Sequence, residues 1–260
     1  MSAEKPTILI VHGAWHTPKH YTKLTKVLGD MGYEVHCPIH PTVNEARPPT
    51  ASLAEDTSNI RSYAEDLVNQ GKNVVALMHS YGGQVGTNAL YGLGTKERSE
   101  KGLPGGVSRL IYLSAHALAI GQSMVDKVKE MGHEALIPLV FDIAEDMTIV
   151  IRDCKAFLFG QQTDYPEEEM QAYISDLKLW NGQAMYDPLS QCAWKEIPAS
   201  FIVTLNDTAI LEPYQRASIE MMKREGIEVE AFDLASGHCP NLTAADEVAS
   251  LVNKIVSRAQ

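Results

Sequence analysis

The chain has no long apolar run and fewer basic than acidic residues. None of its hydrophobic runs approaches the roughly 20 residues that a transmembrane helix needs. It carries 22 Lys and Arg against 33 Asp and Glu, which gives a net charge of −11. Nucleic acids and anionic membranes attract proteins through basic patches. We therefore expect neither a nucleic acid nor a membrane as a partner.

Metal-binding and cofactor-binding patterns are also lacking. The four cysteines have no C-x-x-C pair and no metal-ligand spacing: Cys37, Cys154, Cys192 and Cys239. The glycine-rich stretch 101–106 has neither P-loop nor dinucleotide-binding spacing. Residues 1–6 do not resemble a signal peptide, and disulfides are rare in reducing compartments. We expect no metal, no cofactor and a cytoplasmic location.

What the chain does have is a regular alternation of strand-like and helix-like segments. Apolar runs typical of buried strands occur at 8–11, 34–37, 73–77, 109–114, 200–205 and 229–232. Helical patterns lie between them. One covers 21–31, and a second begins at a capping box formed by Ser52 and Glu55 and stops at Gly71. The last begins near Thr243. Strands that alternate with helices pair in parallel. The sequence predicts a single α/β domain over 1–260.

The region between Ser114 and Ala199 breaks this alternation. It contains helical patterns and loops but no βαβ unit, and Pro166 followed by three glutamates predicts a helix with proline at its first position. The region is rich in apolar and aromatic side chains, which include Phe141, Phe157, Phe159, Trp180 and Tyr186. We define residues 117–196 as the inserted segment.

A serine stands where the strand at 73–77 passes into a helix. Residues 76–83 read ALMHSYGG, a pattern typical of a nucleophile elbow, in which a sharp turn exposes a serine hydroxyl above the sheet. The turn presses backbones together, so it favours small residues two positions before and after the serine. Gly82 meets this condition after Ser80, whereas Met78 replaces the usual glycine before it. The alternative is a serine in an ordinary strand-to-helix turn.

An acid and a histidine follow at the ends of two later strands. A serine nucleophile needs a base to remove its proton and a carboxylate to orient that base. Asp207 ends the apolar run from 200, and His238 lies in the loop after 229–232. The order Ser80, Asp207, His238 is nucleophile, acid, base. Asp233 is the competing acid, but it lies next to the histidine loop and not at the end of the penultimate strand.

The first strand ends in His-Gly-Ala-Trp-His at 12–16. An acyl-transfer enzyme stabilises its oxyanion with backbone N–H groups, which we assign to Ala14 and Tyr81. Gly13 lets the backbone approach the substrate without a side chain between them. The further candidates for the substrate pocket are Gly13, Trp15, His16, His116, Trp180 and Tyr186.

Taken together, these segments resemble the α/β-hydrolase branch that holds plant methylesterases and hydroxynitrile lyases, with many fungal and bacterial esterase-like proteins. The resemblance covers essentially the whole chain and rests on 12–16, 79–83, Asp207 and 237–238, with a weaker echo at 193–198. It implies an α/β-hydrolase fold, with a mostly parallel central sheet, helices on both faces and a mainly helical lid formed by the inserted segment.

The resemblance implies a serine hydrolase that cleaves a small, partly apolar carboxylic ester or lactone through an acyl-enzyme. The hydroxynitrile lyases of this branch carry threonine at the position of Gly13 and lysine at that of Cys239, so both positions favour hydrolysis over cyanohydrin cleavage. A C–C lyase or decarboxylase that uses the triad as a base is the alternative, followed by a non-catalytic small-molecule binder. A homodimer is a further hypothesis.

Overall fold

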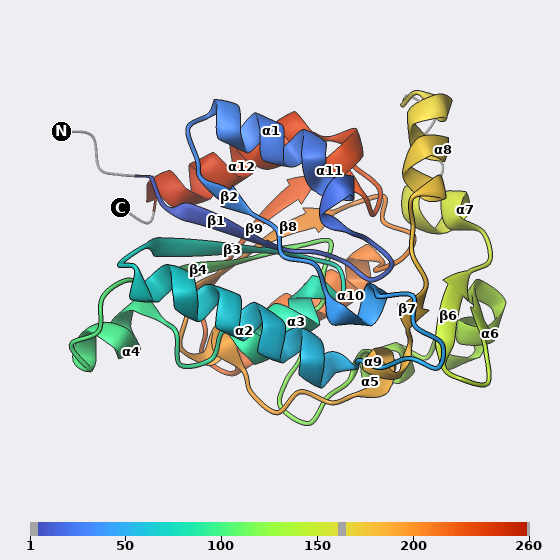
Figure 1. The fold of residues 1–260 in the computed structure, drawn as a ribbon, viewed down its shortest axis with the longest axis horizontal. Helices are drawn as coiled ribbons and strands as arrows, with labels where there is room; N and C mark the ends of the chain where they lie inside the picture. The colour runs from blue at the N-terminus through green and yellow to red at the C-terminus, as the bar shows by residue number, and fades with distance from the viewer. Residues whose placement is uncertain (1–4, 161–164, 259–260) are drawn as a thin grey trace.

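In the computed structural model, residues 5–160 and 165–258 are described. Residues 1–4, part of the stretch compared with a signal peptide, lie outside the described residues. Six parallel strands form the central sheet in the order β2-β1-β3-β4-β8-β9 (Figure 1). Their bounds are β1 Thr7–Val11, β2 Val35–His36, β3 Asn73–His79, β4 Gly106–Leu113, β8 Ala199–Thr204 and β9 Val229–Leu234.

Helices cover both faces of this sheet because side chains alternate along its buried strands. Ile8 and Ile10 of β1 pack with α1 (Thr22–Asp30) and α12 (Ala245–Arg258). Leu9 and Val11 face the other way, into a core shared with α2 (Leu53–Asn69), α3 (Gly82–Ala89) and α10 (Glu212–Arg224). Short helices complete the fold outside the inserted segment: η1 Pro18–Tyr21, η2 Pro41–Val43, α4 Thr95–Glu100 and α11 Pro240–Thr243.

The predicted helix ends agree with the structure in part. The capping box of α2 forms between Ser52 and Glu55. The helix after the serine begins at Gly82, and the last helix is divided into α11 and α12. Pro166 differs from the prediction: it is the N-cap of α8 (Glu167–Ser175) and not its first residue, because its backbone is extended (ψ 122).

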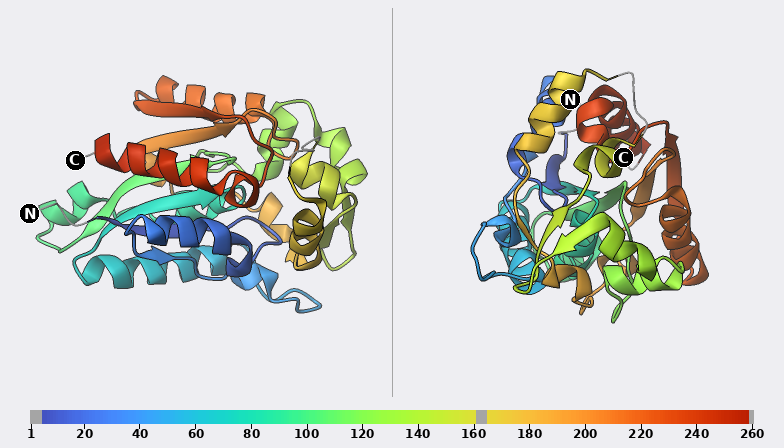
Figure 2. Two further views of the ribbon diagram at one scale, coloured as in Figure 1. Left: turned by 90° about the horizontal axis from the view of Figure 1, so that it is seen from above. Right: turned by 90° about the vertical axis from the view of Figure 1, so that its right-hand side faces the viewer.

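The inserted segment leaves the central sheet after β4 and returns to it at β8. Figure 2 shows most of it gathered at one end of the molecule, beyond the carboxyl ends of the central strands, whereas its last residues run back to the amino end of β8. Its helices are α5 Met124–Glu130, η3 Glu134–Leu136, α6 Ile137–Val140, α7 Cys154–Phe159, α8, α9 Gln183–Tyr186 and η4 Ala193–Lys195. It also contains a three-stranded antiparallel sheet of β5 Phe141–Ile143, β6 Thr148–Ile151 and β7 Trp180–Asn181. The sequence predicts only helices and loops here, because strands this short show no readable periodic pattern.

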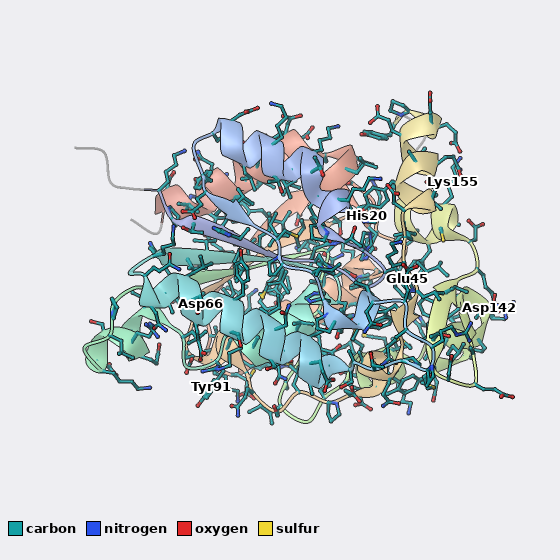
Figure 3. The ribbon with its side chains drawn as sticks, in the orientation of Figure 1. His20, Glu45, Asp66, Tyr91, Asp142 and Lys155 are labelled. Atoms are coloured by element: carbon teal, nitrogen blue, oxygen red, sulfur yellow. The ribbon has the colours of Figure 1, made fainter. Side chains whose placement is uncertain are left out.

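Ion pairs join neighbouring elements on the outer surface of the inserted segment. Asp142 and Lys155 lie there (Figure 3), where Asp142 pairs with Arg152 and Lys155 pairs with Glu167. Both pairs are exposed, so each contributes little to stability. Across 5–160 and 165–258, the helices all fall short of the length and apolarity that crossing a membrane would require.

Candidate active site

Ser80 lies at the turn between β3 and α3 with a φ of 56°. A positive φ is uncommon for a residue with a side chain, and such strain clusters at functional sites. The Ser80 N–H donates to the Leu113 carbonyl at the end of β4 (3.2 Å), which fixes the turn to the neighbouring strand. A Cβ on Gly82 would collide with the Val11 carbonyl. The turn therefore requires a glycine two residues after the serine.

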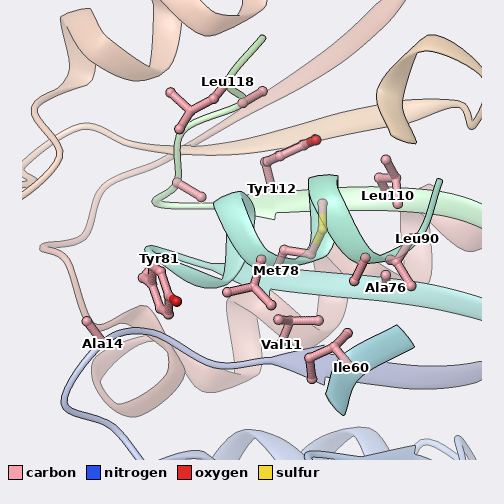
Figure 4. Packing of buried hydrophobic residues seen from close by; sticks show 14 of the residues in the cluster. Val11, Ala14, Ile60, Ala76, Met78, Tyr81, Leu90, Leu110, Tyr112 and Leu118 are labelled. Atoms are coloured by element: carbon pink, nitrogen blue, oxygen red, sulfur yellow. The ribbon is translucent and has the colours of Figure 1, made fainter. Parts of the chain in front are cut away.

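Met78 is accommodated before the serine by a second glycine. Its side chain runs along α3, where Gly86 leaves the space that the thioether fills (Figure 4). A Cβ on Gly86 would collide with the Met78 sulfur. Met78 is fully buried in the core beneath the helix. The bulky residue at this position in β3 is therefore matched by a small one in α3.

Ser80, His238 and Asp207 form one continuous hydrogen-bonded line. His238 Nε2 lies 2.9 Å from the Ser80 Oγ, and its Nδ1 lies 2.9 Å from the nearer Asp207 oxygen. All three residues are buried. With Asp207 accepting from Nδ1–H, the Nε2 lone pair is free to take the serine proton.

The Asp207 carboxylate is held by groups besides the histidine. The N–H groups of Ala209 and Ile210 donate to one oxygen (2.9 and 2.8 Å), and the Thr204 hydroxyl donates to the other (2.8 Å). Asp233, the competing acid, is instead half-exposed and pairs with Arg216 at 2.7 Å. The structure thus brings Asp207 to His238 and places Asp233 elsewhere.

Two backbone N–H groups near Ser80 are unpaired. In the part of the chain that the structure describes, the N–H groups of Ala14 and Tyr81 have no hydrogen-bond acceptor. The Tyr81 hydroxyl donates to Asp56 (2.8 Å), which holds the tyrosine ring away from the serine. The Gly13 N–H is used differently, because it donates to the Tyr21 hydroxyl (3.0 Å).

Tyr21 and His79 connect the loop after β1 with the histidine loop. The Tyr21 hydroxyl donates to His79 Nδ1 (2.6 Å), and His79 Nε2–H donates to the backbone carbonyl of His238 (2.7 Å). Burial, with His238 nearby, lowers the pKa of His79 to about 3. The imidazole is therefore neutral and supplies the one donor and one acceptor that this chain of hydrogen bonds needs.

An apolar pocket opens above Ser80. Trp15 and His116 line it, together with Ala14 and His238. The inserted segment supplies one wall, and the stretch from Thr208 to Tyr214 supplies another. The remaining lining residues are Met124, Val128, His133, Leu136, Ile137, Val140, Phe141, Phe157, Met185, Thr208, Ala209, Ile210, Leu211 and Tyr214.

Four predicted pocket residues do not line this pocket. Gly13 lies beneath it, where a Cβ would come within 3.2 Å of Ser80 and His79. The His16 ring is buried behind the loop, 3.8 Å from the Cys239 sulfur. Trp180 is fully buried, with its ring against Trp15 (centroids 4.9 Å apart). Tyr186 is 38% exposed at the end of α9. Aromatic content alone does not say which side chains face inward.

Other residues of the site are not predicted from the sequence. His133 and Tyr214 are not singled out, although the 208–214 stretch directly follows Asp207 and could have been found by that position. Backbone contacts also tie the inserted segment to the site. The His238 N–H donates to the Leu158 carbonyl (3.1 Å), and Trp15 Nε1–H donates to the Ile149 carbonyl (2.8 Å). Both loops of the site are therefore braced by the inserted segment.

Within the residues that the structure describes, no group of three or more His, Cys, Asp or Glu side chains is arranged to hold a metal ion. His12 and His40 instead bond to each other's backbone: the His40 N–H donates to His12 Nε2, and His40 Nε2 bonds to the His12 carbonyl.

Comparisons with known proteins cover nearly the whole chain. Residues 8–251 match the model of the alpha/beta hydrolase family. The alpha/beta hydrolase nvfD of Aspergillus novofumigatus (strain IBT 16806) is 28% identical over 263 residues, which cover 98% of each chain. Among solved structures, an extracellular alpha/beta-hydrolase from a Paenibacillus species shares the fold with a TM-score of 0.76 at 18% identity, covering 96% of this chain and 98% of that chain.

The methylesterase MES16 from Arabidopsis also shares the fold, with a TM-score of 0.71 at 18% identity, covering 97% of this chain and 99% of that chain. At such identities the structural likeness concerns the fold, whereas the family model spans the sheet and the site together. The chain therefore belongs to the alpha/beta hydrolase family and is a hydrolase.

Proposed function

We propose that this hydrolase cleaves a small, partly apolar carboxylic ester or lactone through an acyl-enzyme on Ser80. The observation that carries the proposal is the unbroken line of hydrogen bonds from Asp207 through His238 to Ser80, at the floor of an apolar pocket. The esterase-like structures that share the fold, such as the Arabidopsis methylesterase, support the same reaction class.

In the first step, Ser80 Oγ attacks the ester carbonyl carbon while its proton passes to His238 Nε2. The carbonyl oxygen becomes an oxyanion, which accepts hydrogen bonds from the Ala14 and Tyr81 N–H groups. Such preorganised donors are worth a few kcal/mol each in the transition state. The intermediate then collapses, the alcohol leaves with the proton from Nε2, and the acyl group stays on Ser80.

In the second step, water attacks the acyl carbonyl and gives a proton to Nε2, and Ser80 leaves with that proton. Asp207 keeps the imidazole in the required tautomer in both steps. A lactone would yield one hydroxy acid, because its alcohol and acyl parts belong to the same molecule. The pocket lining favours a partly apolar substrate, since most of its side chains are hydrocarbon or aromatic.

Cys239, the residue after His238, disfavours the release of cyanide. Cys239 is fully buried, and burial raises the pKa of its thiol well above the ordinary value. A neutral thiol offers no cation to a departing anion. We further propose that the inserted segment is a lid that sets substrate choice, because its residues line the wall of the pocket that faces Ser80.

A fluorophosphonate probe tests the nucleophile. We expect it to label the parent enzyme on Ser80 and to leave Ser80→Ala unlabelled and nearly inactive. Mass spectrometry during turnover should detect an acyl group on Ser80. Asp207→Asn should lower kcat by about 10⁴, since the imidazole would then adopt the wrong tautomer.

Asp233→Asn is the matched control, because Asp233 is a carboxylate on the neighbouring strand that contacts Arg216 and not His238. It should change kcat by less than about twofold, as surface substitutions away from the site do. The proposal fails if labelling survives in Ser80→Ala or if Asp233→Asn costs more activity than Asp207→Asn. Turnover of a β-keto acid with no ester hydrolysis and no acyl adduct would show a lyase instead.

A further inference from the structure

One polar residue lies in the apolar pocket without a partner. His116 lines the same pocket as Ser80 and is only 4% exposed. Its Nδ1 is fully buried and makes no hydrogen bond within the described residues. Buried polar atoms are almost always paired in native proteins, so an unpaired one in a pocket points to a missing ligand group.

The position of His116 is fixed by its backbone. Gly83, in the first turn of α3, has no Cβ, and one placed there would come within 2.5 Å of the His116 carbonyl. The next N–H, that of Ala117, donates to the Ser218 hydroxyl of α10 (3.3 Å). Two helices thus hold this short stretch after β4, and the imidazole is presented to the pocket by a rigid frame.

Two further polar side chains line the pocket beside it. The Tyr214 ring lies 5.5 Å from the His116 ring, measured between centroids. The Tyr214 hydroxyl is hydrogen-bonded to His133 Nδ1 (2.7 Å), and both residues line the pocket. We call His116, His133 and Tyr214 the polar subsite. The neighbouring lining side chains of α5 and α6 are apolar, among them Met124, Val128 and Ile137.

We propose that the polar subsite binds a neutral hydroxyl or carbonyl oxygen of the substrate, separate from the ester group that Ser80 attacks. The natural substrate would then be an oxygenated ester or lactone and not a plain alkyl ester. This inference rests on the proposed function, because Ser80 and the polar subsite line the same pocket and would hold two parts of one molecule.

The charge of the subsite fits a neutral ligand group. Burial, and then the ammonium of Lys127 and the ring of His238, lower the pKa of His116 to about 3. The imidazole is therefore uncharged and offers one N–H and one lone pair. Lys127 is itself buried and paired with Glu130 at 2.8 Å, so its charge is already compensated. Among the described residues that line the pocket, no free cation is left for a carboxylate.

Binding to the Ser80→Ala variant tests the inference without requiring turnover. Titration calorimetry would compare p-nitrophenyl hexanoate with two ketone derivatives, in which the fourth or fifth acyl carbon is a carbonyl. We expect the better ketone to bind about three- to tenfold more tightly than the plain ester, which is the effect of one hydrogen bond. Adding His116→Phe should reduce that ratio to about one.

His36→Phe is the matched control in the same Ser80→Ala background, because His36 lies on β2 and is bonded to Glu34 and Tyr63. It should keep the preference for the ketone, and circular dichroism should show that both variants are folded. A ratio that His116→Phe leaves unchanged, or equal binding of all three esters before that substitution, overturns the inference. If the ratio falls as expected while the parent hydrolyses none of the esters, the polar subsite stands and the proposed function fails.

Discussion

The Tyr21 hydroxyl links two loops of the site that are far apart in the sequence. It accepts from the Gly13 N–H next to Ala14 and donates to His79, which in turn holds the carbonyl of His238. Tyr21 touches none of the reacting atoms. It is a positioning residue, which orients the loop that carries one of the two unpaired N–H groups.

Tyr21→Phe should therefore lower kcat about ten- to a hundredfold and change KM little, because the Ala14 N–H is the proposed oxyanion donor and displacing such a donor acts mainly on the transition state. The unpaired Gly13 N–H and His79 Nδ1 should also lower the free energy of unfolding by about 1–3 kcal/mol. Steady-state kinetics and urea unfolding measure the two effects.

Tyr112→Phe is the control for this substitution. The Tyr112 hydroxyl is also buried, but its partner is the hydroxyl of Thr87 in the core beneath α3. Tyr112→Phe should lower the free energy of unfolding and leave kcat unchanged. Equal losses of kcat in the two variants would show that Tyr21 has only a structural role.

Residues that act through a motif could be predicted, whereas residues that act through packing could not. Ser80, Asp207 and His238 stand at strand ends in a recognisable order, and the structure brings them together. Tyr21 appears in the sequence as the first apolar position of a helical pattern. Its hydroxyl meets His79 only because the fold brings the end of η1 to the end of β3, and no local pattern encodes that approach.

Helix α3 and strand β3 are packed through the pair Met78 and Gly86. A Cβ on Gly86 would collide with the Met78 sulfur, so the two positions depend on each other. The turn that carries Ser80 lies between these two elements, and their spacing determines how the serine is held.

Gly86→Ala should lower the free energy of unfolding by about 1–3 kcal/mol, the usual effect of overpacking a core. Met78→Ala leaves space for the new methyl group, so the double variant should be more stable than the two single losses added together predict. Chemical denaturation of the four proteins measures this coupling. Strictly additive losses would show that the two side chains do not compete for the same space.

A second prediction at the scale of elements concerns the effect of the inserted segment on substrate choice. Phe141 lines the pocket and stacks against Trp15 (centroids 5.5 Å apart). Phe141→Ala should therefore change the order of kcat/KM among esters of different chain length. Tyr186→Ala, in the same segment but outside the pocket lining, should leave that order as it is. If both variants keep the parent's order, the segment does not set substrate choice.

Elements that are long enough to show a periodic pattern of apolar residues could be predicted from the sequence, and short elements could not. The alternation of strands and helices predicts the parallel sheet, and the capping box predicts the start of α2. The three strands within the inserted segment are two to four residues long. β5 and β6 pair as a local hairpin that is too short to show a period, and β7 pairs with β6 from a separate part of the segment, which no local pattern reveals.

At the scale of the whole molecule, several histidines are buried without charge. Burial is the largest cause that lowers the pKa of six of them, His12, His16, His20, His40, His79 and His116. The ring of His238 faces His79 and His116, Asp207 faces His79, and Lys127 faces His116. The folded protein therefore resists protonation at these rings.

The unfolded chain binds these protons near pH 6.5, whereas His79 and His116 bind them near pH 3 in the folded protein. The unfolded state holds more protons between these values, so stability is full above about pH 6.5 and falls as the pH decreases. Each such histidine contributes a slope of about 1.4 kcal/mol per pH unit.

Urea unfolding across this range should show the loss of stability, and His116→Phe should make the slope shallower by about one proton. A free energy of unfolding that is constant from about pH 7 to about pH 5 would contradict the prediction, as would an unchanged slope in the variant.

The pairing of β4 with β8 has a consequence for biosynthesis. These neighbouring strands are separated in the chain by the whole inserted segment, from Leu113 to Ala199. While the ribosome is still making that segment, the apolar strand β4 is an unprotected edge, and Ser80 has neither of its two partners. Nascent chains at this stage are candidates for chaperone binding and for aggregation through β4. Catalytic competence would then begin only after the last strand has emerged.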